Sequence, residues 1–432
     1  MTAIAMKRFH ACCLTALLGL AALPAGAAPA AATSLSQPQP APGKAANPPW
    51  NLARLGPPPR TWPADGYRAE GCRPIFFEGL PFQGKPTRVF AWLGLPPAGA
   101  GGKVPGIVLV HGGGGTAYAE WVQLWNARGY AAIAFDHTGC VPVKNAAGTG
   151  WQRHPDGGPF MGATNQVKQP PADQWMYHAV ADTILATSLL ASLPEVDAER
   201  IGITGISWGG VVTCIVAGLD CRLKFAAPVY GCGYISGDDH DGSRFVGIKE
   251  PMAKVDAWRE LWDPLHYLPA ATLPMLWLDG TNDFAFTLRA VQSSYRAAAH
   301  SPHTLSTHVR LVHGQKPGAA PEEIRAFADS IVKGGAPLAK ITGQGVEGGT
   351  AWVEHQSEIP IVSATLNFTR DEGKWQERKW ESLPATIDDA RRRASASLPE
   401  DATAWFISLT DKRNLVVSSE HQTLPPPADN SP

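Results

Sequence analysis

Charged side chains are scarce in this sequence, and the two signs nearly cancel. Asp, Glu, Lys and Arg make up 17% of the 432 residues, with 37 basic and 38 acidic side chains and a formal net charge of −1. The longest run of like charge is the short arginine stretch at residues 391–393. Nucleic-acid-binding domains usually carry a basic patch or stripe, so the sequence argues against nucleic acid as a partner.

Long apolar runs are equally scarce, and the clearest one, at residues 11–23, is short. Lys7 and Arg8 precede it, and Pro24 and the small residues 25–28 follow. This order is typical of a secretory signal peptide and predicts cleavage after Ala27. A membrane-spanning helix, the alternative, needs about 20 apolar residues. We therefore expect residues 1–27 to be removed and the mature protein to be exported, to the periplasm or the medium, without membrane insertion.

Cysteine is rare, and five cysteines follow the predicted signal peptide: Cys72, Cys140, Cys214, Cys221 and Cys232. An odd number leaves at least one free thiol; the sequence allows a disulfide but specifies no pairing. No C-x-x-C spacing occurs, which excludes the common zinc patterns. The Asp-Asp-His-Asp stretch at residues 238–241 lacks a second ligand cluster and is typical of a solvated loop. We therefore expect no metal and no cofactor.

Glycine and proline are abundant, with 44 and 39 residues. Residues 28–64 are Pro-rich and predict a linker or surface arm. From residue 65 to 335, apolar strands alternate with helices, which predicts a mostly parallel sheet covered by helices on both faces, an α/β fold. The predicted strands lie at 87–95, 104–110, 130–135, 200–206, 224–230, 273–278 and 307–312, and the predicted helices at 117–128, 175–193, 208–218, 287–299 and 321–332.

The pattern changes after residue 337. Residues 362–368 and 405–417 alternate apolar and polar side chains with turns between them, which predicts a small all-β sandwich over residues 338–422, Ig- or fibronectin-like, followed by a disordered tail at 423–432. Trp375 and Trp380 lie five residues apart, so a straight strand would point them to opposite faces. We expect them to pack rather than to form a carbohydrate-binding strip, and we treat this region as an accessory domain.

A candidate nucleophile lies in the sequence Gly-Ile-Ser-Trp-Gly at residues 205–209. The G-x-S-x-G pattern is weak alone, but here a predicted strand precedes Ser207 and a predicted helix follows it, as a nucleophile elbow requires. The sequence His-Gly-Gly-Gly-Gly at 111–115 follows another predicted strand. Its unobstructed backbone amides, with the amide of Trp208, are suited to bind a developing oxyanion.

A candidate acid and a candidate base follow two later strands. Asp279 and Asp283 both lie in the loop after the strand at 273–278; Asp279 is typical of a turn residue, so we favour Asp283. His313 directly follows the strand predicted at 307–312, whereas His303 and His308 are not at a strand's carboxyl end. A histidine there can lie between the acid and Ser207 and accept the serine proton.

The order Ser, Asp, His along the chain is that of the α/β-hydrolases. More narrowly, residues 111–115, 205–210 and 280–283 resemble secreted bacterial members grouped with acetylxylan esterases, dienelactone hydrolases and prolyl-oligopeptidase-type catalytic domains, over about residues 70–335. The resemblance implies a triad of Ser207, Asp283 and His313 and an oxyanion hole formed by the amides of Gly113 and Trp208. Strict dienelactone hydrolases have a cysteine nucleophile, which weakens dienelactones as the substrate.

The predicted function is that of an exported serine carboxylic ester hydrolase acting through an acyl-enzyme. The resemblance implies a small-molecule or polysaccharide ester as substrate, of the acetylxylan type. A prolyl-oligopeptidase-type peptidase is the alternative enzyme, but its usual large N-terminal domain cannot be built from the Pro-rich arm. A catalytically silent binding protein is the alternative of another class, and the four intact catalytic pieces argue against it. The oligomeric state is not specified.

Two long segments, at 148–175 and 231–269, follow predicted strands on the side of the site, and we expect them to shape the pocket. Trp151, Trp208 and Trp262 are candidates for stacking on a substrate ring, with packing as the alternative.

Overall fold

The structure, a computed structural model, describes residues 48–97, 102–236, 243–244 and 252–424. The predicted signal peptide, most of the Pro-rich arm and the stretch at 238–241 lie outside these ranges. Within them, no helix has the length and the apolar character that crossing a membrane requires.

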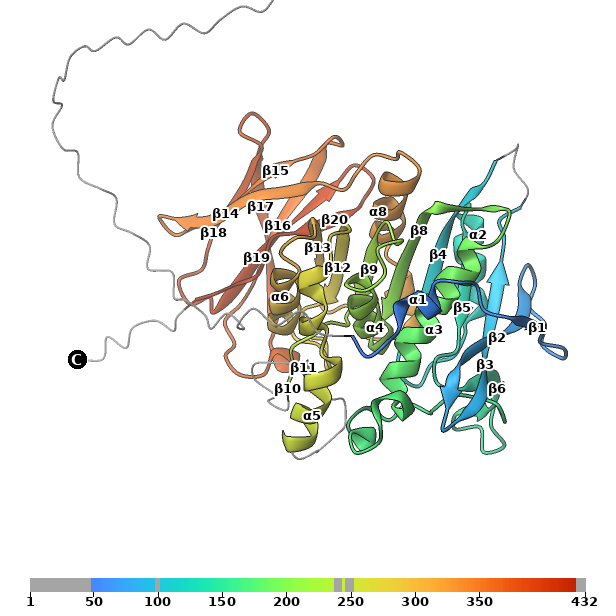
Figure 1. The fold of residues 1–432 in the computed structure, drawn as a ribbon. Coiled ribbons are helices and arrows are strands. Elements are labelled where there is room, and N and C mark those ends of the chain that lie inside the picture. The colour runs from blue at the N-terminus through green and yellow to red at the C-terminus, as the bar shows by residue number, and fades with distance from the viewer. Residues whose placement is uncertain (1–47, 98–101, 237–242, 245–251, 425–432) are drawn as a thin grey trace, which may run out of the picture. The chain divides into compact units, whose positions relative to one another are not determined.

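The larger sheet has nine strands and carries the site (Figure 1). Its strands from β5 to β13 run parallel, while β1, β2 and β3 pair antiparallel at the other edge. The parallel pairing and the helices on both faces confirm the α/β prediction, and the central strands β4 and β5 are apolar along their length, as strands buried on both faces should be. In spatial order the strands are β1 (Thr61–Pro63), β2 (Arg73–Phe82), β3 (Lys85–Gly94), β5 (Ala131–Phe135), β4 (Val104–Val110), β8 (Val196–Ile206), β9 (Ala226–Val229), β12 (Met275–Gly280) and β13 (His303–His308).

Helices cover both faces of this sheet. Val108 and Val110 of β4 share one core with helices α1, α3, α4, α5 and α6, whereas Ile107 and Leu109 share the other core with α2 and α8. The alternation follows from the strand geometry, which points successive side chains to opposite faces. The helices are α1 (Leu52–Leu55), α2 (Ala119–Ala127), α3 (Trp175–Ala191), α4 (Trp208–Ala217), α5 (Met252–Trp262), α6 (Leu288–Ala297), α7 (Gln315–Ala319) and α8 (Glu322–Val332).

Short elements fill the connections. Two small ribbons pair β6 (Cys140–Lys144) with β7 (Trp151–Arg153), and β10 (Ile235–Ser236) with β11 (Ser243–Arg244). The 3-10 turns are η1 (Ala163–Gln166), η2 (Pro171–Asp173), η3 (Pro264–His266), η4 (Leu268–Ala270) and η5 (Trp375–Glu377).

The N-terminal edge begins earlier than the predicted boundary at residue 65. Residues 61–63 pair with β2 as an edge strand, and the buried Trp50 donates its indole N–H to the carbonyl oxygen of Tyr177 at 2.8 Å. The end of the predicted arm is therefore part of the α/β unit. The hairpin of β2 and β3 was predicted only in its second strand.

The strand predicted at 307–312 is wrong in position, because β13 spans His303–His308. Val312 is 68% exposed, so the apolar residues at 309–312 belong to a loop instead of a buried strand. His303 and His308 are in the strand, and His308 is the residue at its carboxyl end. The candidate base His313 follows five residues later.

The C-terminal region is an antiparallel β structure, as predicted. Strand β17 pairs with β16 through residues 380–385 and with β18 through residues 386–388, so it joins two halves of one eight-stranded arrangement. Val353 of β15 and Leu366 of β16 belong to one apolar core. The strands are β14 (Lys340–Glu347), β15 (Thr350–Gln356), β18 (Arg393–Ser397), β17 (Trp380–Asp388), β16 (Ile361–Thr369), β19 (Ala404–Asp411), β20 (Val416–Ser418) and β21 (Gln422–Thr423).

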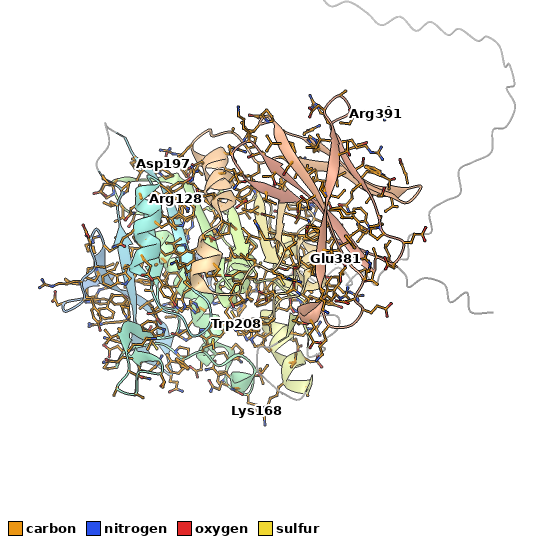
Figure 2. All side chains as sticks on the ribbon, turned by 180° about the vertical axis from the view of Figure 1, so that it is seen from behind. Arg128, Lys168, Asp197, Trp208, Glu381 and Arg391 are labelled. Carbon is orange, nitrogen blue, oxygen red and sulfur yellow. The ribbon has the colours of Figure 1, made fainter. Side chains whose placement is uncertain are left out.

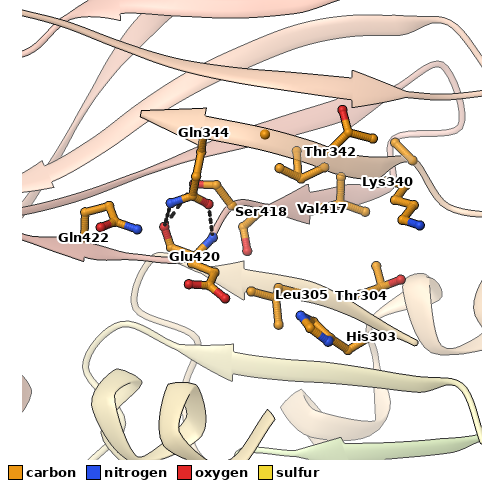
Figure 3. A pocket seen from close by; sticks show the side chains of 14 residues that line it. His303, Thr304, Leu305, Lys340, Thr342, Gln344, Val417, Ser418, Glu420 and Gln422 are labelled. Carbon is orange, nitrogen blue, oxygen red and sulfur yellow. Dashed lines mark hydrogen bonds between the residues drawn. The ribbon is translucent and has the colours of Figure 1, made fainter. Parts of the chain in front are cut away.

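Strand β20 lies beside β13, the edge strand of the larger sheet. The Ser306 hydroxyl donates to the carbonyl oxygen of Val416 at 2.9 Å, and the N–H of Thr307 donates to Oγ of Ser418 at 3.0 Å. A cavity of about 280 Å³ lies there, where the Gln344 amide bonds both backbone groups of Glu420 (Figure 3). Because one core continues through both regions, the domain boundary at 335–338 stays a prediction. Thr423, placed in the predicted tail, belongs to β21, which pairs with β19 through residues 422–423.

Candidate active site

Ser207 lies at a sharp turn between β8, which ends at Ile206, and α4, which begins at Trp208. Its backbone has φ 59° and ψ −121°, a conformation that is costly for a residue with a Cβ. The turn is held by a hydrogen bond from the N–H of Ser207 to the carbonyl oxygen of Val229 at 2.9 Å. Both the strand and the helix predicted around this serine are present.

Two glycines make this turn sterically possible. A Cβ on Gly205 would lie 2.1 Å from the carbonyl oxygen of Gly209, and a Cβ on Gly209 would lie 2.0 Å from that of Val110. Both distances are far below a contact distance, and both neighbours are backbone atoms that cannot move aside. The two outer glycines of the G-x-S-x-G pattern are therefore required by close approach of the backbone.

The structure brings Ser207, His313 and Asp283 together in a chain of hydrogen bonds. Nε2 of His313 lies 2.9 Å from Oγ of Ser207, and Nδ1 of His313 lies 2.5 Å from Oδ2 of Asp283. A carboxylate only accepts, so Nδ1 carries the proton and Nε2 is left to accept from the serine hydroxyl. Asp283 is buried, and the His313 side chain is 13% exposed.

Asp283 and Asp279 differ in their contacts. Oδ1 of Asp283 accepts from the N–H groups of Ala285 and Phe286, both at 2.8 Å, which fixes the carboxylate toward His313. Oδ1 of Asp279 accepts from the N–H of Gly280, while its buried Oδ2 has no hydrogen-bond partner in the structure. Burial, and then the neighbouring Asp283 charge, raises the pKa of Asp279 well above its usual value. The geometry therefore selects Asp283 over Asp279.

Aromatic rings surround the His313 imidazole. The ring of Tyr230 lies 4.4 Å from it at 30°, and that of Phe284 lies 4.6 Å away at 62°. The Tyr230 hydroxyl donates to the carbonyl oxygen of Gly314 and accepts from its N–H at 3.1 Å. Burial raises the pKa of Tyr230, so its hydroxyl stays protonated and holds the residue next to the histidine.

The glycine loop after β4 lies against the nucleophile. A Cβ on Gly112 would lie 3.1 Å from Cβ of Ser207, and one on Gly113 would lie 2.6 Å from the Trp208 ring. The carbonyl oxygen of Gly112 accepts from Nδ1 of His111 at 2.7 Å and from the N–H of Gly115 at 3.1 Å. C=O and N–H of a trans peptide point in opposite directions, so the N–H of Gly113 points away from the inside of the loop.

A second histidine supports this loop from behind. Nε2 of His137 donates to the carbonyl oxygen of His111 at 2.8 Å, and the two imidazoles are stacked with centroids 4.0 Å apart. Nδ1 of His137 then accepts from the Trp175 indole at 3.3 Å. Burial, and then the neighbouring His111, lowers the pKa of His137 well below its usual value, while burial lowers that of His111. Both rings are therefore neutral at pH 7.

The segment at 148–175 borders the site, as expected. The Trp151 indole donates to the carbonyl oxygen of Gly114 at 2.9 Å, and Sδ of Met161 would lie 2.9 Å from a Cβ on Gly113. Trp208 and Trp262 are buried, at 7% and 0% exposure. Trp208 packs against the rings of Trp175 and Trp258, so these two candidates for ring stacking are packing residues instead.

The C-terminal region contacts the acid loop directly. The Asn282 amide, next to Asp283, donates to the carbonyl oxygens of Trp375, Gln376 and Arg378 at 3.4, 3.3 and 2.7 Å. Trp375 and Trp380 are buried and stacked at 6.4 Å, so the packing prediction is confirmed. The expectation of opposite faces is wrong, because Trp375 belongs to the 3-10 turn η5 and not to the strand.

Metal and disulfide chemistry find no support in the described ranges. Groups of three or more His, Cys, Asp or Glu suited to a metal are absent from the part of the chain that the structure describes, and the stretch at 238–241 lies outside it. Cys72, Cys140, Cys214 and Cys221 lie within the described part, and each is a free thiol.

Comparison with known proteins agrees with the resemblance seen in the motifs. Residues 71–237, less than half of the chain, match the family model of the acetyl xylan esterases (AXE1). No curated protein matches the sequence. The family match indicates that the protein is an enzyme of the carboxylic ester hydrolase class and that the α/β unit carries the matched residues.

Solved structures with a related fold include esterases and peptidases. An acetyl xylan esterase from a Paenibacillus species is 22% identical and covers 65% of this chain and 92% of its own, with a TM-score of 0.47. Acetyl xylan esterase 1 from a Thermoanaerobacterium species is 16% identical, covers 63% and 91%, and has a TM-score of 0.46. The acylaminoacyl peptidase of Pyrococcus horikoshii is 19% identical, covers 61% and 43%, and has a TM-score of 0.46.

Several residues of the site were not found from the sequence. Tyr230 ends a predicted strand at the edge where the other site residues lie, so its position was a usable signal. His137 follows the strand at 130–135 in the same way. Asn282 and the segment at 375–379 carried no such signal, because their contact joins positions about 95 residues apart.

Proposed function

We propose that this protein is an exported serine ester hydrolase with Ser207 as nucleophile, His313 as general base and acid, and Asp283 as the residue that orients His313. The observation that carries the proposal is the hydrogen-bonded chain from Ser207 through His313 to Asp283 at the carboxyl ends of parallel strands. Its geometry is that of the serine hydrolase triad.

The first half of the proposed reaction forms an acyl-enzyme. Oγ of Ser207 attacks the ester carbonyl carbon while its proton moves to Nε2 of His313. The carbonyl oxygen becomes an oxyanion, which the N–H groups of Gly113 and Trp208 stabilise. The intermediate then collapses, the carbon–oxygen bond to the alcohol breaks, and His313 returns the proton to the leaving alcohol oxygen.

The second half uses the same groups with water. Nε2 of His313 accepts a proton from water, the hydroxide attacks the acyl carbon, and the bond to Oγ of Ser207 breaks. His313 gives the proton back to Oγ, and the carboxylic acid leaves. Asp283 keeps Nδ1 of His313 protonated throughout and stabilises the imidazolium that forms in each half.

The substrate in this proposal is an acylated saccharide of the acetylxylan type. The match of residues 71–237 to the acetyl xylan esterase model supports it, and so does the signal peptide predicted at residues 1–27. Cleavage after Ala27 is tested by the mass of the protein recovered after export, which should begin at Ala28.

The decisive experiment measures hydrolysis of p-nitrophenyl acetate by the wild type, by Ser207→Ala and by a control, Ser330→Ala. The Ser330 hydroxyl lies in α8, outside the hydrogen-bonded chain of Ser207, and donates to the carbonyl oxygen of Phe327. We expect turnover to fall by a factor on the order of 10⁴ or more in Ser207→Ala and to persist in the control. A fluorophosphonate should also label the peptide that contains Ser207. Equal turnover by the wild type and Ser207→Ala would refute the proposal.

A substrate panel then tests which class of acyl donor the enzyme hydrolyses. Acetylated xylan, a feruloylated sugar and a proline-containing peptide are compared with the same enzyme preparation. Release of acetate from the xylan at the highest kcat/KM supports the proposed substrate class. Cleavage of the peptide alone would contradict the esterase assignment and leave the triad intact.

A further inference from the structure

A cavity of about 390 Å³ adjoins the candidate base on the side of the C-terminal sheet. Three segments far apart in the sequence line it: the acid loop with Asp283 and Phe284, the loop before His313, and residues 376–379 that follow Trp375. Its volume lies within the roughly 300 to 1000 Å³ of small-molecule sites. The cavity therefore joins the catalytic loops to a region predicted to be accessory.

The segment at 376–379 is fixed in place by two sets of hydrogen bonds. Asn282 donates to the carbonyl oxygen of Arg378 at 2.7 Å and to those of Trp375 and Gln376 at longer distances. The N–H of Lys379 donates to Oδ2 of Asp371 at 2.6 Å. Since Asn282 is the neighbour of Asp283, the wall of the cavity is attached to the loop that carries the acid.

The charge of the lining is mostly positive. Arg310, Arg378 and Lys379 contribute cations, Glu377 contributes one carboxylate, and Asp283 is already bonded to His313. Among the described residues, no carboxylate lies within ion-pair distance of the Arg310 or Lys379 side chains. The Arg378 guanidinium donates to the carbonyl oxygen of Gly373 through Nε and Nη2 at 3.2 and 3.0 Å and lies over the Trp375 ring. It is thus held in place without a negative partner at contact distance.

The same cavity offers groups that suit a sugar ring. The Phe284 side chain is 47% exposed beside His313, and an exposed aromatic face can pack against the C–H face of a pyranose. Oε1 of Gln376 is buried and has no hydrogen-bond partner in the structure, so it is free to accept from a hydroxyl group. A cationic lining with one aromatic face and one unused acceptor fits a sugar that carries a carboxylate.

We propose that this cavity is a substrate subsite, built partly by the C-terminal sheet, that binds an acidic sugar unit of the acylated saccharide next to the scissile ester. The inference rests on the proposed function and adds a preference for substrates with a uronic acid. Arg310, Arg378 and Lys379 attract the carboxylate, Gln376 accepts from a hydroxyl group, and Phe284 contacts the ring.

The test compares two acetylated xylo-oligosaccharides of equal length, one with and one without a uronic acid. The variant is Arg310→Asn with Lys379→Gln; asparagine tolerates the φ of 58° at position 310. Exposed ion pairs contribute about 0.2 to 1 kcal/mol each, so we expect kcat/KM on the acidic substrate to fall roughly 2- to 30-fold more than on the neutral one. Glu377→Gln should raise the ratio of kcat/KM on the acidic substrate to kcat/KM on the neutral one. It removes the one carboxylate of the lining that is not bonded to His313.

Arg391→Gln is the matched control, because Arg391 lies at the tip of the C-terminal sheet with its side chain 80% exposed (Figure 2). It should leave the ratio of the two substrates unchanged. An equal fall on both substrates in the double variant, or none on either, would overturn the subsite.

A binding measurement separates this proposal from the proposed function. Calorimetry on Ser207→Ala with a non-acetylated, uronic-acid-bearing xylo-oligosaccharide needs no catalysis. Binding that weakens in the added Arg310→Asn and Lys379→Gln background supports the subsite even where ester hydrolysis fails. Ser207-dependent hydrolysis of p-nitrophenyl acetate without binding of the acidic oligosaccharide overturns the subsite and leaves the hydrolase in place.

Discussion

The imidazole of His137 is stacked on that of His111 at 4.0 Å and donates to the carbonyl oxygen of His111 at 2.8 Å. The carbonyl groups of residues 111 and 112 are thereby both held inside the loop, the first by His137 and the second by the ring of His111 itself. The direction of the Gly113 N–H thus depends on two buried, neutral histidines.

We expect His137→Phe to lower kcat for p-nitrophenyl acetate by about 10- to 100-fold, with a smaller change in KM. The ring stack is kept, but the bond to the carbonyl oxygen of His111 is lost, and removal of an oxyanion donor outright costs about 10²–10³ in kcat. Trp175→Phe is the matched control, because it removes the indole N–H that donates to Nδ1 and to the carbonyl oxygen of His137, leaves the bond from Nε2 to His111 in place, and should cost less. A drop confined to KM would show that His137 does not act through the oxyanion.

Asp283 in the acid loop and Asp279 in β12 should respond differently to substitution by asparagine. Asp283→Asn puts an amide opposite Nδ1 of His313, so the imidazole loses the partner that fixes its tautomer, and kcat should fall by a factor on the order of 10⁴. Asp279→Asn should retain most of the activity, since Asp279 contacts Gly280 and not His313. A lower kcat in Asp279→Asn than in Asp283→Asn would show that Asp279 is the acid of the triad.

Asp279→Asn also has an expected effect on stability. The folded-state pKa of Asp279 is raised, so above the unfolded-state pKa near 4 the folded protein keeps a proton that the unfolded chain releases. The wild type therefore loses stability as pH rises, by up to about 1.4 kcal/mol per pH unit from this group, and the asparagine variant does not. Urea denaturation at pH 5 and pH 8 measures the free energy of unfolding of both proteins. The difference, variant minus wild type, should be larger at pH 8 than at pH 5. A constant difference between the two pH values would contradict the buried neutral acid.

The fold, and the meeting of Ser207, His313 and Asp283 in one place, were largely predictable from the sequence. The apolar pattern of α3 extends over 17 residues, so its type is well specified. Ser207 was found because backbone crowding requires glycine on both sides of it, a constraint visible within five residues. Asp283 was predicted from its position after a strand, and so was His313, although the strand before it ends at His308 and not at residue 312.

The rest depended on contacts that local sequence does not encode. Three of residues 309–312 are apolar, as in a buried strand, but the strand is set by pairing of His303 and Thr304 with Met275 and Leu276. Predicting that Trp375 stacks on Trp380 would have required knowing that the chain turns at η5. From the sequence, Asn282 is typical of a turn residue. Its contact with three carbonyl groups of the C-terminal region is visible only in the structure.

Crowding at the elbow gives a stability prediction. A Cβ on Gly209 would lie 2.0 Å from the carbonyl oxygen of Val110, so Gly209→Ala should lower the free energy of unfolding by about 1 to 3 kcal/mol or more. Gly56→Ala is the control, since its Cβ would have no neighbour closer than 3.7 Å. Urea denaturation of both variants checks this, and equal stabilities would contradict the elbow geometry.

Acid sensitivity should depend on His421, which is buried between α6 and the C-terminal sheet. Its carbonyl oxygen accepts from the Gln292 amide, and its ring packs edge-on against Trp375 at 5.2 Å. Burial, and then the positive charge of Arg296, lowers the pKa of His421 to about 3. Between pH 6.5 and 3 the unfolded chain therefore binds a proton that the folded protein excludes, and stability falls as the pH falls through that window by up to about 1.4 kcal/mol per pH unit.

We expect His421→Leu to lose less stability than the wild type between pH 7 and pH 4, while the same change at the exposed His300 leaves the loss unaltered. An unchanged slope in His421→Leu would show that this histidine is protonated in the folded protein.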